Sequence, residues 1–112
     1  MIRVLVVDDH PVVRQGLSAM LRWEPDLEIV GEAADGQEAL QLILEHRPDV
    51  VLLDLRLPSL SGVEIMRQVR PQAPEVRFLV WRDGKYLEVS TTLRHRWVVN
   101  HLRPYPKGAN AG

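Results

Sequence analysis

Apolar-rich segments alternate with stretches of helical periodicity over residues 1–81. Four short segments have the length and the apolar content of strands that are buried on both faces: Ile2–Val7, Leu27–Val30, Val50–Leu53 and Val76–Trp81. Strands of this kind are typical of parallel sheets whose two faces are both covered. We therefore predict a sheet that contains four parallel strands.

Three helices are predicted between these strands. The first begins at Pro11, because proline suits the first turn of a helix, and the second runs from Asp35-Gly36 to Arg47-Pro48. The third begins at Ser61, which has the spacing of a capping box with Glu64. The residues expected to face the core recur with the helical period: Val13, Leu17, Met20 and Leu21, then Ala39, Leu40, Ile43 and Leu44, then Val63, Met66 and Val69.

The alternation of strands and helices determines the fold class that we expect. Strands that are separated by helices pair in parallel through right-handed crossovers, and the helices then lie on both faces of the sheet. The sequence therefore predicts an α/β protein with a parallel sheet at its centre.

The pattern weakens after Trp81. A helix is predicted over Tyr86–Leu93, although its β-branched residues are poor helix formers, and a fifth strand over Trp97–Leu102. Residues 104–112 are rich in proline and glycine and are predicted to be an irregular tail. We assign residues 1–103 to one domain, within which residues 82–103 diverge from the preceding pattern.

Composition limits the classes of protein to consider. A chain of 112 residues with 46% hydrophobic and 26% charged residues suits one globular domain. The absence of cysteine excludes disulfides and thiolate metal sites, and the sequence shows neither a signal peptide nor a membrane span. We expect a cytoplasmic protein without membrane contact.

Acidic residues follow two of the predicted strands. Asp8 and Asp9 come directly after the first strand, and Asp54 comes directly after the third. Ligands of open parallel sheets bind beyond the carboxyl ends of the strands, so the three carboxylates should converge on one site. Clustered carboxylates repel one another unless a cation lies among them, and hard oxygen ligands suit Mg²⁺. The four histidines lack metal-ligand spacing, and we expect none of them, His10 included, to be a ligand.

These residues, together with Pro58 and Gly62, resemble the receiver domain of bacterial two-component response regulators. The segment from Val7 to Leu17 is especially similar to the NarL/FixJ branch, and the resemblance extends from Met1 to about Val80. It implies a flavodoxin-like (CheY-like), doubly wound parallel sheet of five strands in the order 2-1-3-4-5.

The resemblance also implies a chemistry. Asp54 would accept a phosphoryl group from a sensor histidine kinase, and Mg²⁺ would be held by Asp8, Asp9, Asp54 and the backbone carbonyl of Arg56. The chain would then act as a signalling domain, not as an enzyme, and a homodimer is one expected assembly. Within these 112 residues we find no output domain, so we expect no contact with nucleic acid by this chain itself.

Two residues that receiver domains use to hold phosphate are not obvious here. The usual hydroxyl at the end of the fourth strand falls at or next to Arg82. The usual Lys-Pro after the fifth strand has its nearest match in Arg103-Pro104, so Arg103 is the predicted phosphate contact, with Lys107 more distant.

The last third of the chain also differs in charge. Residues 1–75 carry 13 acidic and 7 basic residues, whereas residues 76–112 carry 2 acidic and 7 basic residues. Two explanations stay open. Residues 82–112 are either a native variant or the product of a shifted reading frame.

Three alternative functions follow from the same residues. A pseudo-receiver would keep the fold and bind partners without a working phosphorylation switch. A magnesium-dependent phosphatase would be expected to carry a second acid where Arg56 stands. A dinucleotide-binding module would need glycines after the first strand, where the chain reads Asp8-Asp9-His10-Pro11.

Overall fold

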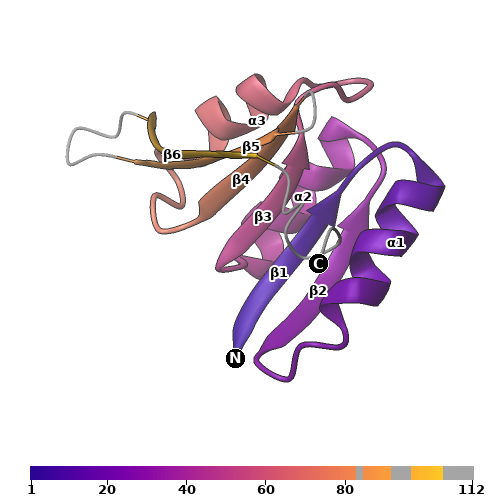
Figure 1. Ribbon diagram of the computed structural model, residues 1–112. Coiled ribbons are helices and arrows are strands. Elements are labelled where there is room, and N and C mark those ends of the chain that lie inside the picture. The colour runs from indigo at the N-terminus through magenta and orange to yellow at the C-terminus, as the bar shows by residue number, and fades with distance from the viewer. Residues whose placement is uncertain (83–84, 92–96, 105–112) are drawn as a thin grey trace.

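The computed structural model describes residues 1–82, 85–91 and 97–104, with side chains described up to Val80. Three helices lie among six strands (Figure 1). In chain order the elements are β1 (Ile2–Val7), α1 (Pro11–Leu21), β2 (Leu27–Ala33), α2 (Gly36–His46), β3 (Val50–Asp54), α3 (Gly62–Val69), β4 (Arg77–Arg82), β5 (Lys85–Thr91) and β6 (Trp97–Pro104).

All six strands form one sheet in the order β2-β1-β3-β4-β5-β6. The pairs β1–β2, β1–β3 and β3–β4 are parallel, which confirms the predicted order of the first four strands. The predicted fifth parallel strand beside β4 is wrong. The neighbour of β4 is β5, which runs antiparallel to it, and β6 runs antiparallel to β5.

The segment after β4 differs from the prediction for a local reason. The helix predicted over Tyr86–Leu93 is wrong, because Lys85–Thr91 is a strand. Its β-branched residues, which weaken a helix, favour a pleated strand. The strand predicted over Trp97–Leu102 exists, but it lies two strands from β4 and extends to Pro104. The rest of the predicted tail, residues 105–112, lies outside the described residues.

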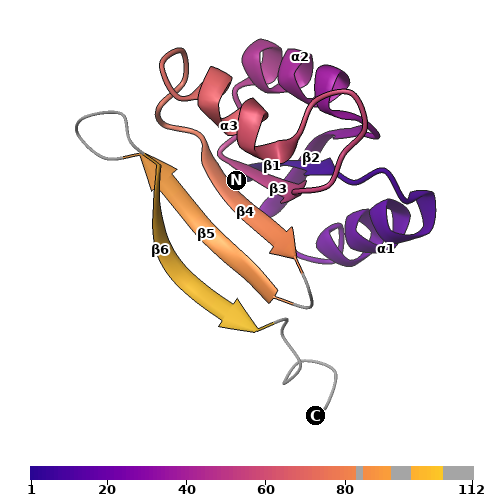
Figure 2. The ribbon, with the colours of Figure 1, turned by 90° about the horizontal axis from the view of Figure 1, so that it is seen from above.

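Helices lie on both faces of the sheet, as predicted. Figure 2 shows α2 and α3 together on one face and α1 on the other. The main core lies between the sheet and the α2–α3 layer, and it includes Leu5, Val7, Ala39, Ile43, Val51, Leu53, Ile65, Val69, Phe78 and Val80. Arg47, in the left-handed conformation with φ of 46°, ends α2 just before Pro48, as expected.

The apolar faces predicted for α3 and α1 are only partly correct. In α3, the Ser61 part of the predicted capping box is observed, since the Glu64 backbone N–H donates to Ser61 Oγ at 3.2 Å, and the Glu64 side chain pairs with Arg67 Nη1. Met66 and Val69 are buried, but Val63 is 53% exposed and Ile65 is buried in its place. The buried face repeats from Gly62, at positions that are three, four and seven residues further on.

Helix α1 buries less of its apolar side than predicted. Val13 is 45% exposed and Met20 is 59% exposed, whereas Ser18 is buried. Among the described residues, α1 is the one helix on its face of the sheet. Side chains of α1 that do not point toward the sheet therefore have no neighbouring helix to pack against. No described helix has the length and the apolar content needed to cross a membrane.

Candidate functional site

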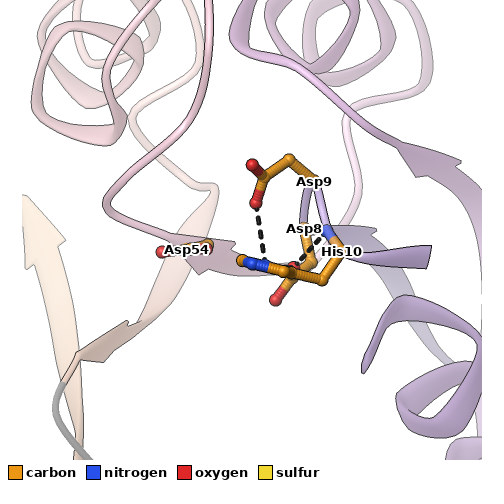
Figure 3. Close-up of side chains that lie close together, drawn as sticks. All are labelled: Asp8, Asp9, His10 and Asp54. Carbon is orange, nitrogen blue, oxygen red and sulfur yellow. Dashed lines mark hydrogen bonds and ion pairs between the residues drawn. The ribbon is translucent and has the colours of Figure 1, made fainter. Parts of the chain in front are cut away.

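The predicted acidic site forms at the carboxyl edge of β1 and β3. The two strands are parallel neighbours, with Val7 opposite Leu53, so Asp8 and Asp54 end adjacent strands at the same level. One side-chain donor atom from each of Asp8, Asp9, His10 and Asp54 lies within 4.8 Å of the others (Figure 3). The convergence of the three carboxylates predicted from the sequence is therefore observed.

Asp8 is the anchored member of the cluster. Its side chain is 6% exposed, and its Oδ1 accepts a 2.8 Å hydrogen bond from the backbone N–H of His10. Its backbone N–H donates to the carbonyl of Ala33 in β2, and its carbonyl accepts from Arg14 Nη1 at 2.8 Å. Arg14 also pairs with Glu32 of β2 at 3.3 Å, so β2 and α1 together fix the loop that carries the acidic pair.

His10 lies among the carboxylates. Its Nδ1 is 3.1 Å from Asp8 Oδ1 and 3.0 Å from Asp9 Oδ1. The hydrogen bond to Asp8, followed by the charges of Asp9 and Asp8, raises the pKa of His10 above its usual value. His10 Nδ1 therefore lies within hydrogen-bond distance of both members of the acidic pair.

Asp54 is half-buried at the end of β3. Its Oδ1 accepts a 2.9 Å hydrogen bond from the backbone N–H of Arg56. Burial raises the pKa of Asp54, the hydrogen bond from Arg56 opposes this rise, and the charges of Asp8 and Asp9 add to it. These surroundings disfavour the ionised form of Asp54, although His10 acts in the opposite direction, and a bound cation would favour it.

The loop between β3 and α3 is fixed by the beginning of α2. The backbone N–H of Gly36 donates to the carbonyl of Pro58 at 3.1 Å. A Cβ atom at Gly36 would overlap the Leu60 carbonyl, so this approach requires glycine. At the other end of the loop, the Gly62 N–H donates to the Leu55 carbonyl at 3.3 Å. Pro58 and Gly62 therefore shape the loop that follows Asp54.

The predicted phosphate contact is not part of this cluster. Asp54 is opposite Trp81, Trp81 is opposite Tyr86, and Tyr86 is opposite Arg103, so Arg103 lies three strands from Asp54. With roughly 4.8 Å between neighbouring strands, the two Cα atoms are about 14 Å apart, which is more than an arginine side chain spans. The backbone of β6 thus disfavours Arg103 in this role, and the Arg103 side chain lies outside the described part of the chain.

Two cationic residues have backbones closer to Asp54 than Arg103 has. Arg82 ends β4, one strand from β3, and Lys85, the residue opposite it, begins β5. The sequence did not indicate that Lys85 lies opposite Arg82, because a helix over Tyr86–Leu93 was predicted in place of the antiparallel strand Lys85–Thr91. The prediction also set His10 aside as a ligand, although the position of His10 directly after two acidic residues was a signal for its place in the cluster.

Comparison with known proteins gives consistent matches. Residues 4–85 match the family described as response regulator receiver domain. The chain is 44% identical over 80 residues to the transcriptional regulatory protein LiaR of Bacillus subtilis, which covers 71% of this chain and 38% of that protein. It is also 40% identical over 92 residues to a protein-glutamate methylesterase/protein-glutamine glutaminase of Nitrosospira multiformis, with 82% of this chain and 26% of that protein covered.

A solved structure gives the same result. The chain is similar to the signal receiver domain of the response regulator NarL from Mycobacterium tuberculosis, with a TM-score of 0.68 and 43% identity over 70% of this chain and 64% of that chain. The chain spans about two-fifths of the length of LiaR. The match over residues 4–85, the 2-1-3-4 strand order and the acidic cluster agree, and the chain belongs to the response regulator receiver domain family.

Proposed function

We propose that Asp54 is the phosphoacceptor of this receiver domain and that it takes its phosphoryl group from a sensor histidine kinase. The observation that carries the proposal is the position of Asp54, half-buried at the end of β3 with a carboxylate oxygen within 4.8 Å of ligand atoms of Asp8 and Asp9. Receiver domains of response regulators partner with sensor histidine kinases, and this chain is such a domain.

We propose in-line attack by the Asp54 carboxylate. Because the Arg56 backbone N–H donates to Oδ1, we assign the attack on phosphorus to Oδ2. The new Oδ2–P bond forms as the bond from phosphorus to the donor nitrogen or oxygen breaks, and the donor leaves with the electron pair of that bond. Positioning and charge neutralisation account for most of the catalysis in such transfers, so a fixed nucleophile beside a cation site is the main requirement.

The residues present fit the magnesium site that receiver domains have at their acidic pocket. Asp8, Asp9 and Asp54 offer hard oxygen ligands, and we propose the Arg56 carbonyl as a further one. The raised pKa of Asp54, caused first by burial and also by the charges of Asp8 and Asp9, supports the proposal, because a bound cation would favour the ionised carboxylate. Bound Mg²⁺ would neutralise charge on the phosphoryl oxygens.

Roles outside this domain are proposals that rest on the relatives. LiaR is a transcriptional regulatory protein, which supports a link of this chain to transcription through a partner or a further domain. The methylesterase match covers the receiver portion only, so we propose no enzymatic activity for this chain beyond the phosphoryl transfer at Asp54. The proposed location is the cytoplasm, and the proposed limits of the domain are residues 1–103.

A pseudo-receiver is the second candidate function. The observation that favours it is Arg82, which ends β4 where a hydroxyl would hold the phosphoryl group. An arginine can pair with phosphate, but its planar fork does not reproduce a hydroxyl contact. A pseudo-receiver would keep the acidic pocket and bind partners without forming a phosphoaspartate.

Phosphorylation by a small donor distinguishes the two candidates. The chain is incubated with acetyl phosphate and Mg²⁺, trapped with borohydride and mapped by mass spectrometry. We expect one adduct, at Asp54, which is absent in Asp54→Asn and retained in Asp26→Asn, a variant of an exposed carboxylate in the turn before β2. An adduct elsewhere would refute the assignment, and the absence of any adduct would support the pseudo-receiver.

A further inference from the structure

We propose that His10 is a metal ligand and that it gives this site a preference for divalent transition metals over Mg²⁺. The inference rests on the proposed cation site at Asp8, Asp9 and Asp54. Figure 3 shows the His10 ring reaching from the β1 side across the site toward Asp54, so that the imidazole lies among the carboxylates.

The separations between the donor atoms suit a shared ion. Neighbouring ligands around an octahedral ion with bonds of about 2.1 Å lie roughly 3 Å apart. His10 Nδ1 is 3.1 Å from Asp8 Oδ1 and 3.0 Å from Asp9 Oδ1. The same nitrogen therefore stands at ligand spacing from two carboxylate oxygens that come from neighbouring residues.

The chain holds His10 in this position independently of its ring contacts. The backbone N–H of His10 donates to Asp8 Oδ1 at 2.8 Å, and the His10 carbonyl accepts from the Arg14 N–H in the first turn of α1 at 2.9 Å. The His10 side chain is 69% exposed, so an ion can reach Nδ1 from solvent. The backbone of His10 is thus held beside the site and the ring lies on an open path, which limits the entropy lost on binding to that of the side chain.

The types of ligand atom determine which ions the site binds more tightly. Carboxylate oxygens suit Mg²⁺, whereas imidazole nitrogen suits cobalt, nickel, zinc and iron, and Mg²⁺ gains little from it. A site with three carboxylates and one imidazole therefore favours the transition metals beyond the general order of their affinities. The competing explanation is that His10 acts only as a counter-ion, which any bound cation displaces.

Titrations with Co²⁺ and with Mg²⁺ separate the two explanations. The wild-type chain is compared with His10→Phe, which keeps a flat ring without a donor, and with His46→Phe as a matched control at the end of α2. If His10 is a ligand, His10→Phe should bind Co²⁺ about tenfold or more weakly and Mg²⁺ about as tightly as the wild type. His46→Phe should resemble the wild type with both ions.

A spectroscopic measurement identifies the ligand directly. On addition of Zn²⁺ we expect the ¹⁵N resonance of His10 Nδ1 to shift by far more than that of any nitrogen of His46. Equal Co²⁺ affinity in His10→Phe and wild type would overturn the proposal, as would tighter binding of both ions by His10→Phe, which is the counter-ion result. If the wild-type chain neither binds Mg²⁺ nor is phosphorylated at Asp54, the proposed function on which this inference rests is refuted instead.

Discussion

At the scale of single residues, the site places more negative than positive charge at the end of β3. Asp8, Asp9 and Asp54 have oxygens within 4.8 Å of one another, and the His10 ring contributes the nitrogen of this cluster. Burial is the largest cause of the raised pKa of Asp54. The ionised Asp54 therefore lowers the stability of the metal-free fold. The same negative charge allows the site to bind a cation.

We predict that Asp54→Asn makes the metal-free protein more stable at pH 7. The substitution removes a charge that burial and two neighbouring carboxylates disfavour, while the amide keeps the shape of the side chain. A gain of about 1 kcal/mol would raise the melting temperature by roughly 5 °C in a domain of this size. Thermal unfolding in the presence of a chelator measures it.

The pH dependence follows from the direction of the pKa shift. The pKa of Asp54 is raised above its usual value of 3.8, so the folded state holds the proton to higher pH than the unfolded state. The destabilisation of the fold by ionised Asp54 is absent at a pH below the usual pKa and increases as the pH rises through the raised pKa. The advantage of Asp54→Asn should therefore be small near pH 4 and largest at neutral pH, and saturating Mg²⁺ should reverse it. An Asp54→Asn protein that melts below the wild type at pH 7 without metal would contradict this account.

At the scale of elements, the beginning of α2 supports the loop that follows Asp54. We predict that Gly36→Ala destabilises the fold by about 1–3 kcal/mol, because the added methyl group would overlap the Leu60 carbonyl. Displacement of this loop should also weaken Mg²⁺ binding. Chemical denaturation measures the first effect, and a fluorescence titration measures the second.

Gly16 provides a matched control for this substitution. It lies in α1, and an added Cβ would meet no atom within 4 Å. Since alanine favours a helix over glycine, Gly16→Ala should stabilise the protein by about 0.5–1 kcal/mol. If both variants change the stability in the same direction, the close approach of Gly36 to Leu60 is not the cause of the Gly36→Ala effect.

The antiparallel neighbour of β4 leads to a prediction about hydrogen exchange. Strand β5 has a partner on each side, whereas β6 has one partner within the sheet. Backbone amides near Leu87 and Glu88 should therefore exchange more slowly than amides in the second half of β6. Equally fast exchange throughout residues 85–104 would show that the β5 ladder does not persist in solution.

The sequence was sufficient for the elements whose signals are local and agree with one another. The four parallel strands, the capping box at Ser61 and the convergence of Asp8 with Asp54 each follow from a short pattern. Residues 85–91 carry conflicting signals, since a helix was expected after a parallel strand and the residues themselves favour a strand. The position of His10 directly after Asp8 and Asp9 indicated its nearness to them, but the hydrogen bond from its backbone N–H to Asp8 Oδ1 could be seen only in the structure.

At the scale of the whole molecule, the two faces of the sheet are covered unequally. Helices α2 and α3 cover one face, and α1 lies on the other (Figure 2). On and beside α1, Val12 is 82%, Met20 59% and Trp23 86% exposed. Exposed apolar side chains gathered along one helix are a common feature of surfaces that associate.

We predict that the chain self-associates through this side of α1 and that Met20→Glu weakens the association, because a charge would have to be buried at the contact. Val63→Glu is the matched control, since Val63 is 53% exposed on α3, on the opposite face. Sedimentation equilibrium over a range of concentrations measures both variants. A wild-type mass that stays monomeric at all concentrations would contradict the prediction, as would an equal effect of the two substitutions.

The reversal of chain direction after β4 divides the sheet into two parts with different folding requirements. Strand β1 pairs with β3 only after α1, β2 and α2 have been accommodated, whereas β5 and β6 each pair with the strand that precedes them in the sequence. Because the pairings of β5 and β6 are local in sequence, we expect this hairpin to open and close as a separate cooperative unit while the α/β core stays folded. A cation bound at Asp54 would then raise the unfolding temperature of the core and leave that of the hairpin nearly unchanged, so unfolding would separate into two transitions as the metal concentration rises.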